Sequence, residues 1–268
     1  MYEQFYGLKV KCFSKTPDPA FLYHGRAHAE ALARLQYAVE ERDLVLLTGE
    51  IGSGKTTLSR ALIDSLDDTY RPMLIINPAL PPAQFLKTLA RKLGVEKPKR
   101  YKVDLLEQIN ERLFKSYEKG VCPVVIVDEA QLIPGKDTFE EIRLLTNFQL
   151  DDKNLMSLVL IGQTELRARL KRPAYGALRQ RIGMSCHLTP LNEDETAEYL
   201  RHRLKVAGRD APLFTEEAVA AIYRCTGGVP RLINTIATGS LLTGFGQGAS
   251  EIDADIVTDV AKDLSLED

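Results

Sequence analysis

The sequence predicts an α/β fold, in which helices flank a parallel sheet, followed by a small all-helical domain. Short apolar runs alternate with segments of helical periodicity along the first part of the chain, a pattern typical of a parallel sheet covered on both faces. After Pro190 only helical periodicity remains. We therefore expect one domain over residues 1–190 and a second over residues 191–268.

The elements are expected in the following order. The first 25 residues are rich in aromatic and turn-forming residues, which indicates an extended arm clamped onto a body, and the boundary at Pro190 groups this arm with the first domain. An amphipathic helix follows over residues 27–41. The expected strands are the apolar runs 44–48, 73–76, 124–127, 158–161 and 184–188. The expected helices are 56–66, 82–93, 105–119 and 138–149, then 193–206, 215–226, 230–245 and 254–264 after Pro190.

Composition excludes several classes of protein but selects no partner. The 44% hydrophobic and 27% charged residues are ordinary for a globular chain, and the net charge of −2 gives no overall attraction to nucleic acid. The longest apolar run, 121–127, is far shorter than the roughly 20 residues that span a bilayer. The first residues lack the pattern of a secretory signal, so we expect a cytoplasmic protein without direct membrane insertion. The four cysteines are scattered, which argues against a zinc site or disulfides.

A glycine-rich stretch between an expected strand and an expected helix carries the strongest chemical signal. Residues 49–56 read G-E-I-G-S-G-K-T and match the phosphate-binding pattern G-x-x-x-x-G-K-[S/T] at every fixed position. Backbone amides of such a loop point at phosphates, the lysine neutralises their charge, and the hydroxyl ligates Mg²⁺. The sequence thus predicts a RecA-like P-loop NTPase that binds ATP and Mg²⁺. The expected nucleotide-binding residues are Gly49, Glu50, Ile51, Gly52, Ser53, Gly54, Lys55, Thr56 and Thr57, with Thr56 also a metal ligand.

Two carboxylates end the expected strand 124–127. Asp128 and Glu129 are in the arrangement of a Walker B element, in which the first acid holds the metal and the second orients an attacking water. We expect Asp128 to hold Mg²⁺ and Glu129 to be catalytic, together with Lys55. The alternative is an ordinary strand that ends in solvated acids.

Gln163 follows the expected strand 158–161. If this strand lies beside the strand that leads into the glycine-rich loop, its carboxyl end faces the phosphates, where ligands of open α/β sheets bind. Gln163 is then expected to sense the γ-phosphate or the attacking water. A simple loop glutamine is the alternative, because the argument depends on strand order.

These motifs together resemble those of AAA+ ATPases, since L-R-Q-R-I precedes the last expected strand at residues 178–182 and G-G-V-P-R opens a helix at 227–231. More narrowly, four stretches resemble the ATPase domain of the general secretion pathway protein A, or ExeA-type, family. They are Y-x-x-F-Y-G-L at 2–8, T-P-D-P-x-F-L-Y at 16–23, D-E-A-Q at 128–131 and G-Q-T-E-L at 162–166. The resemblance covers nearly the whole chain and implies that the C-terminal helices form an AAA+ lid.

The resemblance also implies roles for single residues. Arg181 would be an arginine finger that reaches the γ-phosphate of a neighbouring subunit, with Arg179 as the alternative. Arg231 would contact the nucleotide from the lid as a second sensor. Asn77 would restrain Glu129 until ligand arrives.

The resemblance leaves the role of the N-terminal arm open. Phe21 and Tyr23 would line the adenine pocket, or else they pack into a core.

The resemblance implies an ATP-driven homo-oligomer, a ring or filament, that works with a protein partner in secretion or pilus assembly. Members of the family typically continue into a membrane segment and a peptidoglycan-binding region, neither of which lies within these 268 residues. Stand-alone ATPases of this shape also resemble regulators that bind DNA and partner a transposase. A nucleotide switch with little turnover is a third hypothesis. The lysines and arginines that either contact DNA or form solvated faces are Lys9, Lys11, Lys15, Lys97, Lys99, Arg100 and Lys102.

Overall fold

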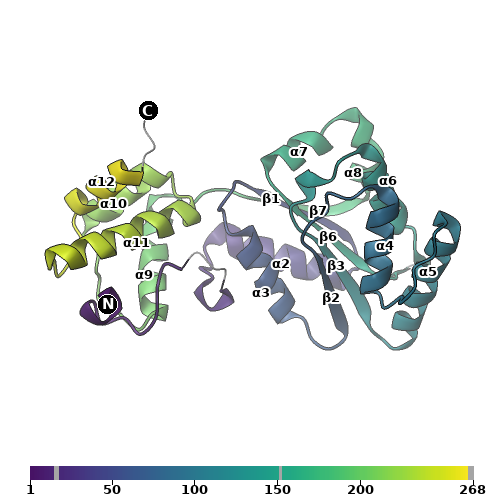
Figure 1. The fold of residues 1–268 in the computed structure, drawn as a ribbon, viewed down its shortest axis with the longest axis horizontal. Helices are drawn as coiled ribbons and strands as arrows, with labels where there is room; N and C mark the ends of the chain where they lie inside the picture. The colour runs from purple at the N-terminus through teal and green to yellow at the C-terminus, as the bar shows by residue number, and fades with distance from the viewer. Residues whose placement is uncertain (15–17, 151–152, 265–268) are drawn as a thin grey trace. The chain divides into compact units, whose positions relative to one another are not determined.

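The computed structural model describes residues 1–14, 18–150 and 153–264 (Figure 1). The chain forms two compact units. We call residues 30–49 and 61–188 the sheet unit, and residues 1–29, 50–60 and 189–268 the helical unit. Lys15, Thr16 and Pro17, which were expected in a basic cluster and a family motif, lie outside the described residues.

The sheet unit is built on five parallel strands in the order β2-β3-β6-β1-β7. The strands are β1 (Leu44–Gly49), β2 (Tyr70–Ile75), β3 (Cys122–Val127), β6 (Ser157–Gly162) and β7 (Ile182–Leu188). Every residue of β1, β3 and β6 is buried, because these continuous apolar runs are covered on both faces. The predicted parallel sheet is therefore confirmed, with β1 next to β6 and β6 next to β3.

Helices cover both faces of this sheet (Figure 1). One face packs Leu46, Val125 and Leu158 against α4 (Pro82–Lys92), α5 (Lys102–Glu118) and α6 (Lys136–Leu145). The alternate strand residues face the side on which Figure 1 shows α2 (Arg26–Glu40) and α3 (Lys55–Ser65). The smaller elements are η2 (Ala130–Leu132), β4 (Gln149–Leu150), β5 (Lys153–Asn154), α7 (Thr164–Leu170), η3 (Pro173–Tyr175) and α8 (Gly176–Arg181).

The helical unit contains α9 (Glu193–Val206), α10 (Glu216–Thr226), α11 (Pro230–Gln247) and α12 (Ala254–Leu264). Side chains fix two helix starts. Asn192 and Glu195 form a reciprocal capping box on α9, and Thr215 accepts from the amide of Ala218 on α10. None of the helices in the described part of the chain combines the length and apolar character needed to cross a membrane.

The N-terminal arm belongs to the same compact unit as these helices, whereas the boundary predicted at Pro190 grouped it with residues 1–190. The arm includes α1 (Tyr2–Phe5) and η1 (Pro19–Phe21). Tyr6 and Phe13 are buried in the core of α9–α12 because this small helical core gains apolar area from the arm. Arg203 donates from Nε to the carbonyl of Cys12 at 2.6 Å.

Candidate functional site

The glycine-rich loop follows directly from β1, and α3 begins at Lys55, as the motif requires. Gly52 and Gly54 have φ values of +83° and +95°, a left-handed region that glycine enters without the steric cost borne by other residues. Ser53 and Lys55 are buried, and Nζ of Lys55 donates to the carbonyl of Glu50 at 2.7 Å. The loop thus has the backbone shape that cradles an anion.

The first turn of α11 packs directly on this loop within the helical unit. The amide of Arg231 donates to the carbonyl of Gly52 at 3.2 Å. A Cβ at residue 52 would lie 2.5 Å from Cβ of Arg231, so only glycine allows this approach. The helix that carries the expected second sensor is therefore in contact with the glycine-rich loop.

His28 also contacts the loop, which the sequence did not indicate. Its Nε2 lies 2.9 Å from the carbonyl of Ser53. Because a carbonyl only accepts, Nε2 carries the hydrogen and Nδ1 is left bare, without a hydrogen-bond partner among the described residues. Burial lowers the pKa of His28 and keeps the ring neutral.

The two acids expected at the end of β3 form a tight turn. Asp128 is buried, and its Oδ1 accepts from the amide of Glu129 at 2.9 Å. Glu129 has φ 52° and ψ 38°, a left-handed conformation that is uncommon for a residue other than glycine. Such conformations often occur where a functional side chain must be aimed in one direction.

The carboxylate of Glu129 lies in a closed hydrogen-bonded triangle with two glutamines. Its Oε2 accepts from Nε2 of Gln131 and, at 3.2 Å, from Nε2 of Gln163. Oε1 of Gln131 in turn accepts from the amide of Gln163 at 3.1 Å. The adjacent strands β3 and β6 end at the same edge of the sheet, which brings the three side chains together.

Gln163 therefore lies where its strand order was expected to put it, since β6 pairs directly with β1. Gln131 was missed. It belongs to the D-E-A-Q stretch, but nothing local in the sequence indicates that an amide two residues beyond Glu129 reaches back to its carboxylate. Asn77, the partner expected for Glu129, accepts instead from the amide of Ala79 at 3.3 Å, and its restraining role remains a prediction.

The two arginines considered as fingers have different surroundings. Nη1 of Arg179 donates to the carbonyls of Leu170 and Lys171 at 3.4 and 3.0 Å, at the C-terminal end of α7. There its charge also complements the helix dipole. Arg181 is exposed and donates from Nη2 to Oδ1 of Asn147 at 2.9 Å.

The arm residues considered for the adenine pocket pack against the core of the helical unit. Tyr23 meets Tyr199 edge to face with ring centroids 6.0 Å apart, and its hydroxyl donates to Glu198. The guanidinium of Arg203 lies 4.8 Å from the ring centre of Phe21. These contacts match the core-packing alternative.

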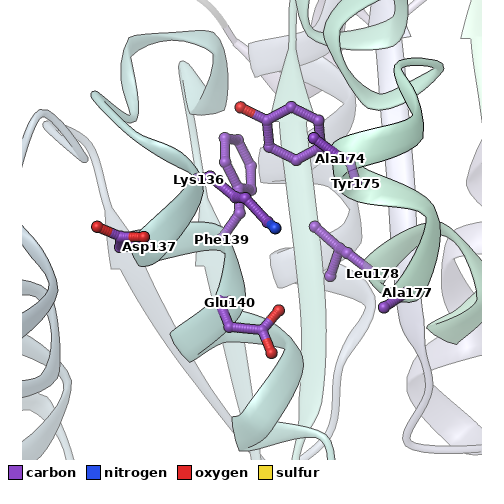
Figure 2. Close-up of a pocket in the computed structure, with 8 residues that line it drawn as sticks. All are labelled: Lys136, Asp137, Phe139, Glu140, Ala174, Tyr175, Ala177 and Leu178. Carbon is purple, nitrogen blue, oxygen red and sulfur yellow. The ribbon is translucent and has the colours of Figure 1, made fainter.

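A separate cavity of about 370 Å³ lies in the sheet unit between α6 and the segment 173–178 (Figure 2). The rings of Phe139 and Tyr175, two of the residues that line it, meet edge to face with centroids 5.5 Å apart. The cavity is lined by Lys136, Asp137, Phe139, Glu140, Ala174, Tyr175, Ala177 and Leu178. None of the expected nucleotide-binding or catalytic residues lines it.

The parallel sheet flanked by helices, with a glycine-rich loop after β1, is the fold of P-loop NTPases, and residues 38–170 match the family model described as an AAA domain. The chain resembles the general secretion pathway protein A of Aeromonas hydrophila, with 41% identity over 255 residues. This alignment covers 94% of the chain and 46% of that protein.

Two further similarities are more distant. An uncharacterised HTH-type transcriptional regulator of Methanocaldococcus jannaschii is 25% identical, covering 88% of the chain and 53% of the regulator. The chain therefore spans about half the length of these relatives. The crystal structure of Cdc6p from Pyrobaculum aerophilum superposes with a TM-score of 0.72 at 20% identity, covering 96% of the chain and 71% of that structure. This last likeness concerns the fold alone.

Proposed function

We propose that the chain hydrolyses ATP in a Mg²⁺-dependent reaction at the carboxyl edge of the sheet. The triangle at Glu129 carries this proposal, because it joins a carboxylate at the end of β3 to Gln163 at the end of β6, the strand that pairs with β1. The nucleotide-binding residues would be the loop 49–56 with Thr57, and Arg231 would contact the nucleotide from α11. The hydroxyl of Thr56 and the carboxylate of Asp128 are oxygen ligands of the kind that suits Mg²⁺.

In the proposed reaction, a water attacks the γ-phosphorus in line as the bond to the bridging oxygen of the diphosphate breaks. Glu129 orients this water and receives its proton. Lys55 neutralises charge on the β- and γ-phosphates, and Gln163 donates to the γ-phosphate. A bound Mg²⁺ supplies further neutralisation of the phosphate charge.

The test is the Glu129→Gln variant. It should bind ATP as the wild type does but hydrolyse it about 100- to 10,000-fold more slowly, the range typical of losing a general base. Glu107→Gln, on the exposed face of α5, is the matched control and should keep wild-type turnover. Near-normal turnover of Glu129→Gln would remove Glu129 from the mechanism.

The finger assignment requires an oligomer, so it is tested by mixing subunits. We propose that ATP binding assembles a ring or filament in which Arg181 acts on a neighbour's γ-phosphate. Mixing Arg181→Ala with Lys55→Ala protein should then restore activity at hybrid interfaces. The parallel experiment mixes Arg179→Ala with Lys55→Ala. Recovery of ATP hydrolysis in this mixture alone would assign the finger to Arg179.

For the biological role we propose a cytoplasmic ATPase that drives assembly or remodelling in secretion or pilus biogenesis. The support is the 41% identity to general secretion pathway protein A over almost the whole chain. This role predicts that the Glu129→Gln protein, loaded with ATP, captures a component of a secretion or pilus assembly. A partner from neither machinery would count against it.

The second candidate is an ATP-dependent DNA-binding regulator that partners a transposase. Two observations favour it: the similarity to an HTH-type transcriptional regulator, and the exposed cations Lys97, Lys99 and Arg100 between α4 and α5. Lys102, the fourth cation of this cluster, pairs with Glu141. Duplex-DNA binding by Glu129→Gln should then require ATP and weaken steeply with salt. No binding under assembling conditions would leave the secretion or pilus role as the better account.

A further inference from the structure

His28 holds the glycine-rich loop from outside. It lies in the first turn of α2, within the helical unit, and its Nε2 donates to the carbonyl of Ser53 at 2.9 Å. A Cβ at residue 54 would lie 3.1 Å from the same nitrogen. The ring of His28 therefore contacts both residues of the Ser53–Gly54 peptide.

This contact determines which way the peptide faces. In a trans peptide such as this one, the carbonyl and the following N–H point in opposite directions. Because the carbonyl of Ser53 is turned toward His28, the N–H of Gly54 is turned away from it. Gly54 directly precedes α3, so this N–H lies with those of the first helical turn, which have no partner within a helix and bind anions.

The loop needs such a contact because its own residues allow more than one orientation. Ser53 lies between Gly52 and Gly54, and glycine adopts left- and right-handed backbone about equally well. The amide of Ser53 donates to the carbonyl of Glu50 at 3.2 Å, but this bond fixes the preceding peptide. The hydroxyl of Ser53 is buried without a hydrogen-bond partner among the described residues, so it does not fix the next peptide either.

Packing alone does not account for a histidine at this position. The ring is buried, and its Nδ1 has no hydrogen-bond partner in the part of the chain that the structure describes. An unpaired acceptor in the interior destabilises the folded chain. A phenylalanine would fill a similar space without that cost, so the bond from Nε2 to the loop is the feature that favours histidine.

We propose that His28 is a positioning residue that preforms the loop for nucleoside di- and triphosphates. By holding the carbonyl of Ser53, it keeps the N–H of Gly54 directed at the α- and β-phosphates, which the amides of such loops contact. His28 acts through the loop rather than on the nucleotide, because Nε2 is bonded and Nδ1 is buried. This inference rests on the proposed role of the loop in ATP binding.

The test measures equilibrium binding of fluorescent ATP and ADP analogues to the wild type, His28→Phe and His28→Gln. Phenylalanine keeps a flat ring but removes the donor, whereas glutamine places an amide N–H at about the position of Nε2. His28→Phe should bind both nucleotides about tenfold more weakly, as for the loss of one hydrogen bond to a charged group. His28→Gln should bind both within about twofold of the wild type. His24→Phe, at an exposed position, is the matched control.

Rescue by glutamine separates positioning from packing. If His28 only filled space, His28→Phe would bind both nucleotides as tightly as the wild type, and the proposal would be overturned. Equal weakening in His28→Phe and His28→Gln would overturn it as well, because loss of the donor would then not be the cause. A loss of affinity for ATP but not for ADP would place the effect at the third phosphate and also contradict the proposal.

Lys55→Ala distinguishes failure of this inference from failure of the proposed function. If Lys55→Ala retains wild-type affinity for ATP, the loop does not bind the phosphates, and both fail. If Lys55→Ala loses affinity but His28→Phe does not, only the inference about His28 is overturned. His28→Leu, which also lacks a donor, should show the same tenfold loss and replaces His28→Phe if that variant does not fold.

Discussion

The glycine-rich loop and the acidic turn after β3 both contain left-handed backbone, but different interactions hold it. In the loop, Gly52 and Gly54 adopt φ values of +83° and +95° at no steric cost. In the turn, Glu129 adopts φ 52° although it has a side chain. Its amide donates to Oδ1 of Asp128, and its carboxylate accepts from the side-chain amides of Gln131 and Gln163. The left-handed backbone of the loop is therefore carried by glycines, whereas that of the turn is carried by a residue whose side chain also bonds Gln163 at the end of β6.

The largest expected effect concerns the loop. Lys55→Ala should weaken ATP binding roughly 100-fold or more, because it removes charge-assisted contacts to the phosphates. Equilibrium binding of a fluorescent ATP analogue measures the change. Lys115→Ala, on an exposed part of α5, is the matched control. Retained micromolar affinity of Lys55→Ala would refute the assignment of the loop.

The second prediction separates the loop's backbone strain from its packing. Gly52→Ala should unfold at lower denaturant concentration and bind ATP more weakly, because its new Cβ would lie 2.5 Å from Arg231. Gly94→Ala is the matched control, with φ +90° and no atom within 4 Å of the added Cβ. It should cost only the left-handed strain of about 1–2 kcal/mol. An equal loss of stability in Gly52→Ala and Gly94→Ala would show that the packing of α11 on the loop does not depend on the close approach at Gly52.

The third prediction tests the strain in the acidic turn. Glu129→Gly and Glu129→Ala both remove the carboxylate, so their difference in stability reports the backbone alone. The glycine variant should be more stable by about 1 kcal/mol, as measured by urea unfolding, because φ 52° costs alanine more than glycine. If the alanine variant is as stable, the left-handed conformation is not maintained in solution.

The smallest expected effect is a pH dependence that originates at the loop. Burial lowers the pKa of His28 in the folded chain, so the unfolded chain binds a proton first as pH falls. The stability that the neutral ring contributes is therefore present above its ordinary pKa of about 6.5 and decreases as pH falls below it. His28→Gln should flatten this part of the stability profile, whereas His24→Gln, at an exposed position, should not. Parallel stability profiles against pH for His28→Gln and the wild type would show that His28 does not cause this pH dependence.

The same difference between loop and turn explains how much the sequence could predict. The sheet, the glycine-rich loop and the acids of β3 were predictable because apolar runs, glycines and terminal carboxylates are local signals. The contacts of Gln131 and His28 were not predictable, because only the folded chain brings their partners together. His28 and Ser53 are 25 residues apart, and Gln131 meets Gln163 across 32.

The boundary predicted at Pro190 grouped the arm with the first domain for a similar reason. Its aromatic residues correctly indicated packing, but an aromatic side chain does not specify which core it joins. Tyr6 and Phe13 pack with helices encoded after residue 190. Only the tertiary contacts of the arm identify its partner.

This contact between the first and last parts of the chain affects folding during synthesis. The bond from Arg203 to Cys12 spans 191 positions in the sequence. At an elongation rate of up to about 20 residues per second, the arm leaves the ribosome roughly 10 seconds or more before its partner helices exist. During that interval its aromatic side chains have no native core to enter. Until α9 emerges, the nascent chain therefore exposes an aromatic segment to which chaperones can bind.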